Sequence, residues 1–316
     1  MGAAFRDSAM IAPPRLRPGD RIGIVAPSGP VLRGYVRNGA KVLESAGFRV
    51  VLARHLFARR GHLAGPDGLR SEDLNRMLRD PDIRCVLMAR GGYGAMRIAD
   101  DVDWGAMRRD PKIFAGFSDA TYLHLGFASQ SRVRTLHGPN LHGLAARRKP
   151  ELDRWFAWVT DPSPPERIRS FHAPAHYAGD GRPVRGTVLG GNLALLDYAV
   201  GTDAMPSFRN AILFLEEVNE PPYKVDGMLC HLRRSRALRG LRGVMLGDFY
   251  RCVPRLRHRE LPLRQVLVDH FGALGVPAVG GIRAGHARRN LALPLGARAT
   301  LDPRRGRVVF EEGLTS

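Results

Sequence analysis

The chain has 316 residues, of which 44% are hydrophobic, and a formal net charge of +19. This length and apolar content predict one large or two medium domains with a sizeable core. No run approaches the roughly 18 apolar residues that a membrane span needs. Residues 1–21 lack the apolar core of a secretory signal, so we expect a cytoplasmic protein with no membrane partner.

The positive charge comes almost entirely from arginine, because only four of the 49 basic residues are lysine. The arginines are spread along the chain without interleaved aromatic residues, and the longest basic run is Arg147-Arg148-Lys149. A nucleic-acid-binding protein more often gathers its basic residues on one face or tail. We therefore interpret the charge as a compositional bias and expect no nucleic-acid partner, although a positive field also favours anionic partners. The three separated cysteines, Cys85, Cys230 and Cys252, argue against a disulfide framework.

The first half alternates between strand and helix patterns. In chain order these are a strand over 22–26 with a turn at 27–30, a helix ending at Gly47, a strand over 48–53, a helix from Ser71 to before Pro81, a strand over 85–89 with a glycine-rich turn at 90–94, a strand over 112–117, a helix after it, and a strand over 133–136. Such alternation predicts a parallel sheet covered by helices. Ligands then bind beyond the carboxyl ends of the strands, which are the turns at 27–30, 90–94 and 117–119.

A proline-rich stretch at 161–166 predicts a linker, so we expect an α/β domain over 1–160, a linker over 161–180 and a smaller mixed α/β domain with β structure over 181–316. The second domain should contain a strand over 187–189, a helix opened by Gly190-Gly191-Asn192, a strand over 211–215, a helix over 225–238, a strand over 243–246, a helix over 263–271, and β segments over 297–301 and 308–310.

Ser118 lies between the strand over 112–117 and the helix that follows it. A serine at such a sharp turn projects from the sheet, with the N–H groups of the first helical turn directed at whatever it attacks. Ala120 replaces the second glycine of the usual G-x-S-x-G elbow. The alternative is that Ser118 and Asp119 only cap the helix.

A nucleophilic serine needs a base and an acid that orients the base. Glu216 ends the apolar run 212–215, and His286 lies in a loop. Because successive strand residues face opposite sides, only one of Glu216 and Glu217 can point toward that histidine. The alternatives are an exposed acidic pair and a surface histidine.

The turn at 90–94, Arg-Gly-Gly-Tyr-Gly, lacks the spacing of known phosphate-binding loops. Its small residues instead favour the close approach of a backbone N–H to a reacting oxygen, although the glycines could simply supply positive φ angles. No set of His, Cys, Asp or Glu has the spacing of a metal site, so we expect no metal and no cofactor.

Seven motifs occur in an order that resembles the L,D-carboxypeptidase (muramoyltetrapeptide carboxypeptidase) family, which includes the microcin-resistance peptidases. They are Ala26-Pro27-Ser28-Gly29-Pro30, Arg90-Gly91-Gly92-Tyr93-Gly94, Gly116-Phe117-Ser118-Asp119, His137-Gly138-Pro139, Gly190-Gly191-Asn192-Leu193, Leu213-Phe214-Leu215-Glu216 with Pro222-Tyr223, and Gly285-His286. The resemblance extends from about residue 15 to residue 302.

The resemblance implies a serine peptidase with an α/β amino-terminal domain and a smaller carboxy-terminal domain. By motif, Ser118 is the nucleophile, Glu216 the acid and His286 the base, and the N–H groups of Gly92 and Asp119 form the oxyanion hole. The implied substrate is a murein tetrapeptide that loses a carboxy-terminal D-alanine, and we expect a homodimer. The alternatives are a self-immunity peptidase that cleaves a peptidyl-nucleotide antibiotic, and a non-catalytic α/β binding protein.

Overall fold

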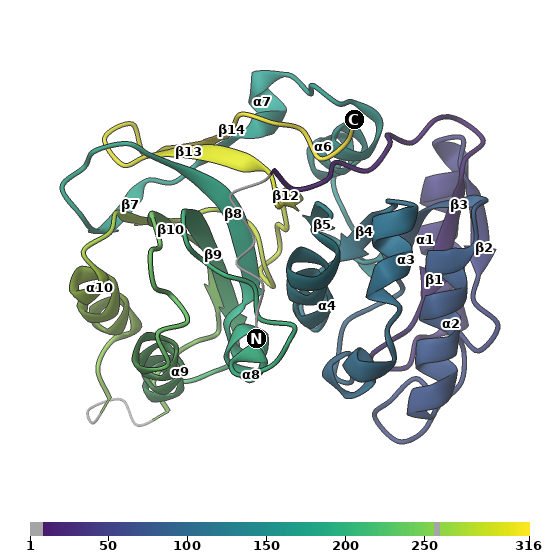
Figure 1. Ribbon diagram of the computed structural model, residues 1–316, viewed down its shortest axis with the longest axis horizontal. Helices are drawn as coiled ribbons and strands as arrows, with labels where there is room; N and C mark the ends of the chain where they lie inside the picture. Colours follow the sequence, from purple (N-terminus) through teal and green to yellow (C-terminus); the bar gives the residue numbers. More distant parts are fainter. Residues whose placement is uncertain (1–8, 256–259) are drawn as a thin grey trace.

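A computed structural model describes residues 9–255 and 260–316 as two sheets with helices packed around them (Figure 1). The first sheet has the strand order β12-β5-β4-β3-β1-β2. Its five strands from the first half of the chain are parallel, whereas β12 is antiparallel to β5. The strands are β1 (Arg21–Val25), β2 (Arg49–Leu52), β3 (Ile83–Met88), β4 (Ile113–Gly116), β5 (Thr135–His137) and β12 (Leu293–Leu295).

The helices of this half follow the strands as the alternating pattern predicts. They are α1 (Arg33–Ser45), α2 (Asp67–Arg79), η1 (Met96–Asp101), α3 (Trp104–Arg109), α4 (Ala120–Gly126), η2 (Phe127–Ser131), α5 (Leu141–Leu144) and α6 (Lys149–Thr160). Gly47, at φ +89°, follows the end of α1 as the expected C′ glycine. The turns after β1, β3 and β4 lie at one edge because these strands are parallel neighbours.

The second sheet has the order β6-β14-β13-β8-β9-β10-β11-β7, with β8 to β11 parallel and the outer strands antiparallel. Its elements are α7 (Glu166–Arg169), β6 (Ser170–His172), β7 (Ala175–Ala178), β8 (Val184–Asn192), α8 (Leu193–Ala199), β9 (Ala211–Val218), α9 (Pro222–Arg234), β10 (Gly243–Tyr250), α10 (Leu263–Leu274), β11 (Ala278–Gly280), β13 (Arg298–Asp302) and β14 (Arg307–Phe310).

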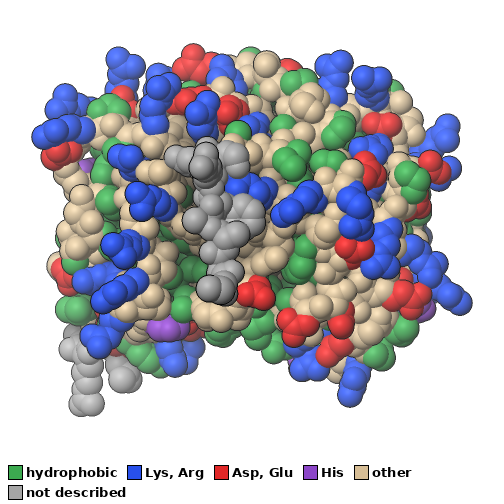
Figure 2. Space-filling model, viewed as in Figure 1, with side chains coloured by type: hydrophobic (Ala, Val, Ile, Leu, Met, Phe, Trp, Pro, Cys, Tyr) green, Lys and Arg blue, Asp and Glu red, His purple; other side chains and the backbone are tan. Residues whose placement is uncertain are grey.

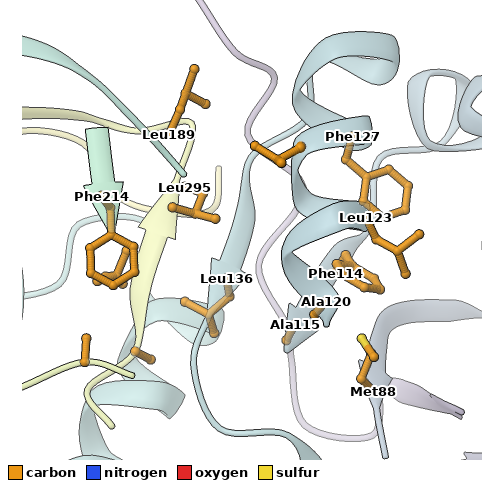
Figure 3. Close-up of a cluster of buried hydrophobic side chains, with 14 of the residues drawn as sticks. Met88, Phe114, Ala115, Ala120, Leu123, Phe127, Leu136, Leu189, Phe214 and Leu295 are labelled. Atoms are coloured by element: carbon orange, nitrogen blue, oxygen red, sulfur yellow. The ribbon is translucent and has the colours of Figure 1, made fainter. Parts of the chain in front are cut away.

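The two sheets share one buried apolar cluster. In Figure 3, Leu295 of β12 lies between Phe214 of β9 and Leu136 of β5, so the carboxy-terminal half of the chain reaches into the first sheet. Trp158 adds a second tie, because its indole N–H donates to the carbonyl of Ala292 at 2.9 Å. Figure 1 shows α4, which follows the predicted elbow, between the two sheets.

The α/β class and the parallel first sheet are confirmed, but several elements differ from the predictions. The stretch 161–180 contains α7, β6 and β7, and the two strands belong to the second sheet, which has eight strands. Gly190 and Gly191 lie inside β8 rather than opening a helix. Strand β9 runs to Val218, so both glutamates lie within it. In the described residues, no helix is long and apolar enough to cross a bilayer.

Candidate active site

Ser118 forms the predicted elbow between β4 and α4. Strand β4 ends at Gly116, Ser118 has a left-handed φ of +66°, and α4 begins at Ala120. A non-glycine residue in this region costs about 1–2 kcal/mol, and such strain is concentrated at functional sites. The neighbouring turn leaves room for the serine only because residue 91 is glycine: a Cβ on Gly91 would lie 2.9 Å from the Ser118 Cβ.

The Asp119 side chain does not cap α4; it joins the three turns at the edge of the first sheet. Its buried carboxylate accepts hydrogen bonds from Ser28 Oγ at 2.5 Å and from the Ala95 N–H at 2.8 Å. Burial raises the pKa of this carboxyl, although both hydrogen bonds and the charge of Arg70 act in the opposite direction. The elbow is therefore held against the turns that follow β1 and β3.

Two backbone N–H groups are available beside Ser118. The carbonyl of Gly91 accepts from the Gly29 N–H at 3.3 Å. Because a trans peptide directs its C=O and N–H in opposite directions, the Gly92 N–H points away from Gly29. Neither this N–H nor that of Asp119 donates a hydrogen bond within the described part of the chain. Both can donate to a ligand.

The side chains of Glu216 and His286 are in hydrogen-bonding contact, the arrangement expected of an acid that orients a base. His286 Nδ1 lies 2.6 Å from Glu216 Oε2, and the glutamate is fully buried in β9 whereas the imidazole is 17% exposed. Gly285, at φ +132°, permits this contact, because a Cβ there would lie 2.7 Å from the same carboxylate oxygen. The pairing leaves Nε2 as the second ring nitrogen to act on a ligand.

His286 also packs on the residue before the elbow serine. Its ring centroid lies 4.9 Å from that of Phe117. The structure contains no hydrogen bond between Ser118 Oγ and His286, and among the residues it describes the serine hydroxyl has no partner. In free enzymes such contacts are often loose and tighten only when the substrate binds.

Asp248 is a site residue that the sequence reasoning missed. The β9–β10 register shifts between Leu246 and Phe249, so Gly247 and Asp248 together oppose Glu216 in a β-bulge, a feature that often redirects a side chain near active sites. The Asp248 N–H donates to the carbonyl of Ala284 at 2.9 Å, and its Oδ2 is buried without a partner in the described chain. Burial and the charge of Glu216 raise the pKa of Asp248 to about 6.

Acidic neighbours set the basicity of His286. Burial alone would lower the pKa of this histidine, but the hydrogen bond and charge of Glu216, with the charges of Glu217 and Asp248, raise it above its usual value. Negative charge around an imidazole favours its protonated form. The imidazole is therefore a stronger base than a histidine in water.

Glu217 faces away from His286, as the alternation along a strand predicts. It accepts from Asn192 Nδ2 at 3.0 Å, from the Ala194 N–H at 2.8 Å and from the Val218 N–H at 2.7 Å. Burial raises the pKa of Glu217 to about 7. Its role is to hold the start of α8.

Asn192 connects this glutamate to the elbow helix, a second feature missed from sequence. The Asn192 N–H donates to Thr121 Oγ1 at 2.9 Å. Gly191, at φ +144°, allows the approach, since a Cβ there would lie 2.5 Å from the same hydroxyl oxygen. The Gly190-Gly191-Asn192 motif was the only sequence signal for this bridge.

Among the described residues, no three His, Cys, Asp or Glu gather as metal ligands.

Comparison with known proteins identifies the family of this chain. Residues 22–138 match the family model for the LD-carboxypeptidase N-terminal domain, and residues 185–301 match the model for the LD-carboxypeptidase C-terminal domain. The chain belongs to the LD-carboxypeptidase family. It is thus a peptidase of this family, as the motif order predicted.

Curated relatives include carboxypeptidases of murein peptides. A probable murein peptide carboxypeptidase of Bacillus subtilis is 34% identical over 96% of this chain and 95% of its own. The murein tetrapeptide carboxypeptidase of Pseudomonas aeruginosa is 30% identical over 90% of this chain and 94% of its own. The muramoyltetrapeptide carboxypeptidase structure from Oxalobacter formigenes has a TM-score of 0.82 at 27% identity, with 93% of this chain and 98% of that chain covered.

The chain is also similar to an immunity protein. The microcin C7 self-immunity protein MccF of Escherichia coli is 24% identical over 90% of this chain and 91% of its own. The structure of MccF with glutamyl sulfamoyl guanosine has a TM-score of 0.84 at 22% identity, with 96% of this chain and 99% of that chain covered, which shows a shared fold.

The position of Asp248 predicts that Asp248→Asn lowers the pKa of His286. The variant removes a negative charge that favours the imidazolium, so the pKa should fall by a few tenths of a unit to about one unit. NMR titration of the histidine ring signals, assigned with a His286 variant, measures the shift. Asp226→Asn is the charge-matched control, because Asp226 pairs with His270 instead. An unchanged or higher pKa in Asp248→Asn would contradict this electrostatic account.

Proposed function

We propose that this LD-carboxypeptidase family member is a serine peptidase that releases carboxy-terminal D-alanine from murein tetrapeptide by cleaving an L,D peptide bond. One observation carries the proposal: the buried Glu216–His286 pair lies beside a serine held in a strained elbow. A base oriented by a buried acid next to a projecting serine is the arrangement that acyl transfer requires.

In the proposed reaction, Ser118 Oγ attacks the carbonyl carbon of the scissile bond while His286 Nε2 takes its proton. Glu216 holds the imidazole tautomer and stabilises the imidazolium. The N–H groups of Gly92 and Asp119 donate to the oxyanion of the tetrahedral intermediate. The C–N bond then breaks, and D-alanine leaves with the proton from His286.

The acyl-enzyme is resolved by water. His286 takes a proton from the water molecule, which attacks the ester carbonyl, and the proton returns to Ser118 Oγ as the tripeptide leaves. Every proton in this cycle passes through the histidine, and the cycle uses no cofactor. Our proposal places this enzyme in the cytoplasm, where murein peptides recovered from the wall would be processed, and the homodimer stays a prediction.

The family relationship to MccF supports a second candidate, a peptidase that cleaves a peptidyl-nucleotide. The observation in its favour is the 24% identity to this immunity protein over most of both chains. The same serine chemistry would serve both substrates, so the choice between them depends on the groups that bind the two sides of the scissile bond.

Ser118→Ala should abolish turnover of murein tetrapeptide and leave the fold intact, because a small side chain at a turn carries the covalent step. Product formation by mass spectrometry and labelling by an active-site serine probe measure the effect. Ser28→Ala is the comparison variant, since Ser28 is the other serine at this end of the sheet and its hydroxyl donates to Asp119. Activity that survives in Ser118→Ala but is lost in Ser28→Ala would show that Ser118 is not the nucleophile. A wild-type protein that the probe does not label would favour a binding protein.

Glu216→Gln and Glu217→Gln should have unequal effects. The first removes the charge that holds the His286 tautomer, so kcat should fall by several orders of magnitude, as in other triads. The second keeps a side-chain oxygen for the Asn192 contact and should cost less than about tenfold. Steady-state kinetics on both proteins, with circular dichroism as a check of folding, provides the comparison. A larger loss in Glu217→Gln would reverse our assignment.

Stereochemistry separates the two candidate functions. A tetrapeptide ending in D-alanine should be cut at least about 100-fold faster than its L-alanine isomer, because the wrong isomer leaves its carboxylate and the group that binds it unpaired. Values of kcat/KM for the two isomers and for glutamyl sulfamoyl guanosine decide the matter. Equal rates for the isomers, or rapid cleavage of the nucleoside compound alone, would promote the immunity function.

A further inference from the structure

A hollow of about 840 Å³ lies at the amino-terminal ends of β9 and β10, whereas Glu216 of the candidate active site lies near the carboxyl end of β9. We call it the basic hollow. It is formed by the loop that precedes β9 and the loop between α9 and β10, and four of its lining residues are arginines: Arg209, Arg236, Arg239 and Arg242. None of its lining residues is acidic.

The positive charge of the basic hollow is not balanced locally. Neither 204–215 nor 227–247 contains an aspartate or glutamate. The four arginines form no ion pair with any residue that the structure describes, whereas arginines elsewhere do, as in Arg79–Asp103 and Arg307–Glu166. Figure 2 shows acidic side chains among basic ones over much of one face. An arginine-rich composition alone does not explain two segments that lack acids.

The helix dipole accounts for only part of this charge. Two of the four arginines, Arg236 and Arg239, follow the end of α9, where cations complement the free carbonyl groups of the last turn. Arg209 and Arg242 lie on other segments, before β9 and β10. Their convergence on one hollow is a property of the tertiary fold.

The two loops are fixed to each other, so the hollow is preformed. The Asn210 N–H donates to the Gly240 carbonyl at 2.9 Å, and Arg242 Nε donates to Asn210 Oδ1 at 3.1 Å. Asn210, Arg236 and Gly240 all have left-handed φ angles, of 61°, 61° and 77°. A rigid scaffold lowers the entropic cost of binding.

We propose that the basic hollow binds a small anion with at least two phosphoryl groups. Guanidinium groups match phosphate oxygens with paired N–H donors, and several of them suit a multivalent anion better than orthophosphate. The volume lies within the range of small-molecule sites. The one aromatic lining residue, Phe208, is only 1% exposed, so no ring is available for the base stacking on which single-stranded nucleic-acid binding depends.

This site is separate from the proposed catalytic residues. Ala211 and Glu216 are five residues apart on β9, which places the hollow about 16 Å from the acid along the strand. The anion should therefore bind without competing with the peptide. The proposal does not depend on the peptidase mechanism and is tested without an activity assay.

Isothermal titration calorimetry of the full chain with inorganic pyrophosphate tests the proposal at constant ionic strength. We expect saturable 1:1 binding at least tenfold tighter than that of orthophosphate. Arg236→Gln/Arg239→Gln should weaken pyrophosphate binding at least tenfold. Arg59→Gln/Arg60→Gln removes the same charge from exposed residues of the other half and should change Kd less than twofold. Thermal unfolding confirms that both variants fold.

Three results would overturn the proposal. They are no saturable pyrophosphate binding, an equal loss in both double variants, and tighter binding of a single-stranded oligonucleotide that also depends on Arg236 and Arg239. The first would remove the site, the second would leave only a general effect of net charge, and the third would make the hollow a nucleic-acid surface.

Discussion

Two hydrogen bonds through Asn192 hold the elbow of the first sheet against the acid-bearing strand of the second. Thr121 lies on the helix that follows Ser118, and Glu217 lies beside Glu216, so the bridge fixes the nucleophile relative to the acid. Each bond contributes about 0.5–1.5 kcal/mol net, but a buried group left unpaired costs more. The bridge therefore constrains position more than it adds stability. Strand β12 and Trp158 also tie the two halves of the chain together.

The site is compact because glycines stand where backbone and side chains approach most closely. Gly91, Gly191 and Gly285 each leave space that a Cβ would take from Ser118, Thr121 or Glu216 respectively. Two of the three also have φ angles that L side chains rarely adopt. Of these three approaches, that of Gly191 to Thr121 joins the two sheets, whereas Gly91 and Gly285 bring the serine turn and the Glu216–His286 pair together within their own halves of the chain.

The sequence predicted the features that local patterns encode, and missed those that depend on distant pairing. The elbow at Ser118 follows from an apolar run that stops at a serine before a helical pattern, and the opposite orientations of Glu216 and Glu217 follow from the period of a strand. Strand β12 is only three residues long, and its partner β5 lies more than 150 residues earlier, so no local periodicity could reveal it. Asp248 escaped notice because a bulge, rather than its neighbours in sequence, places it opposite Glu216.

Local charge at the candidate site opposes the charge of the whole chain. The protein carries +19 overall, yet the carboxyl groups of Glu216, Glu217 and Asp248 raise the pKa of His286 against the effect of its burial. Burial, with a further contribution from the charge of Glu216, raises the pKa of Glu217 to about 7 and of Asp248 to about 6. Near neutral pH Glu217 and Asp248 therefore carry less charge than two free carboxylates would. The histidine gains basicity chiefly from Glu216, and Glu217 and Asp248 add to this effect. Net charge consequently says little about this site, because a few groups at contact distance outweigh arginines that solvent screens.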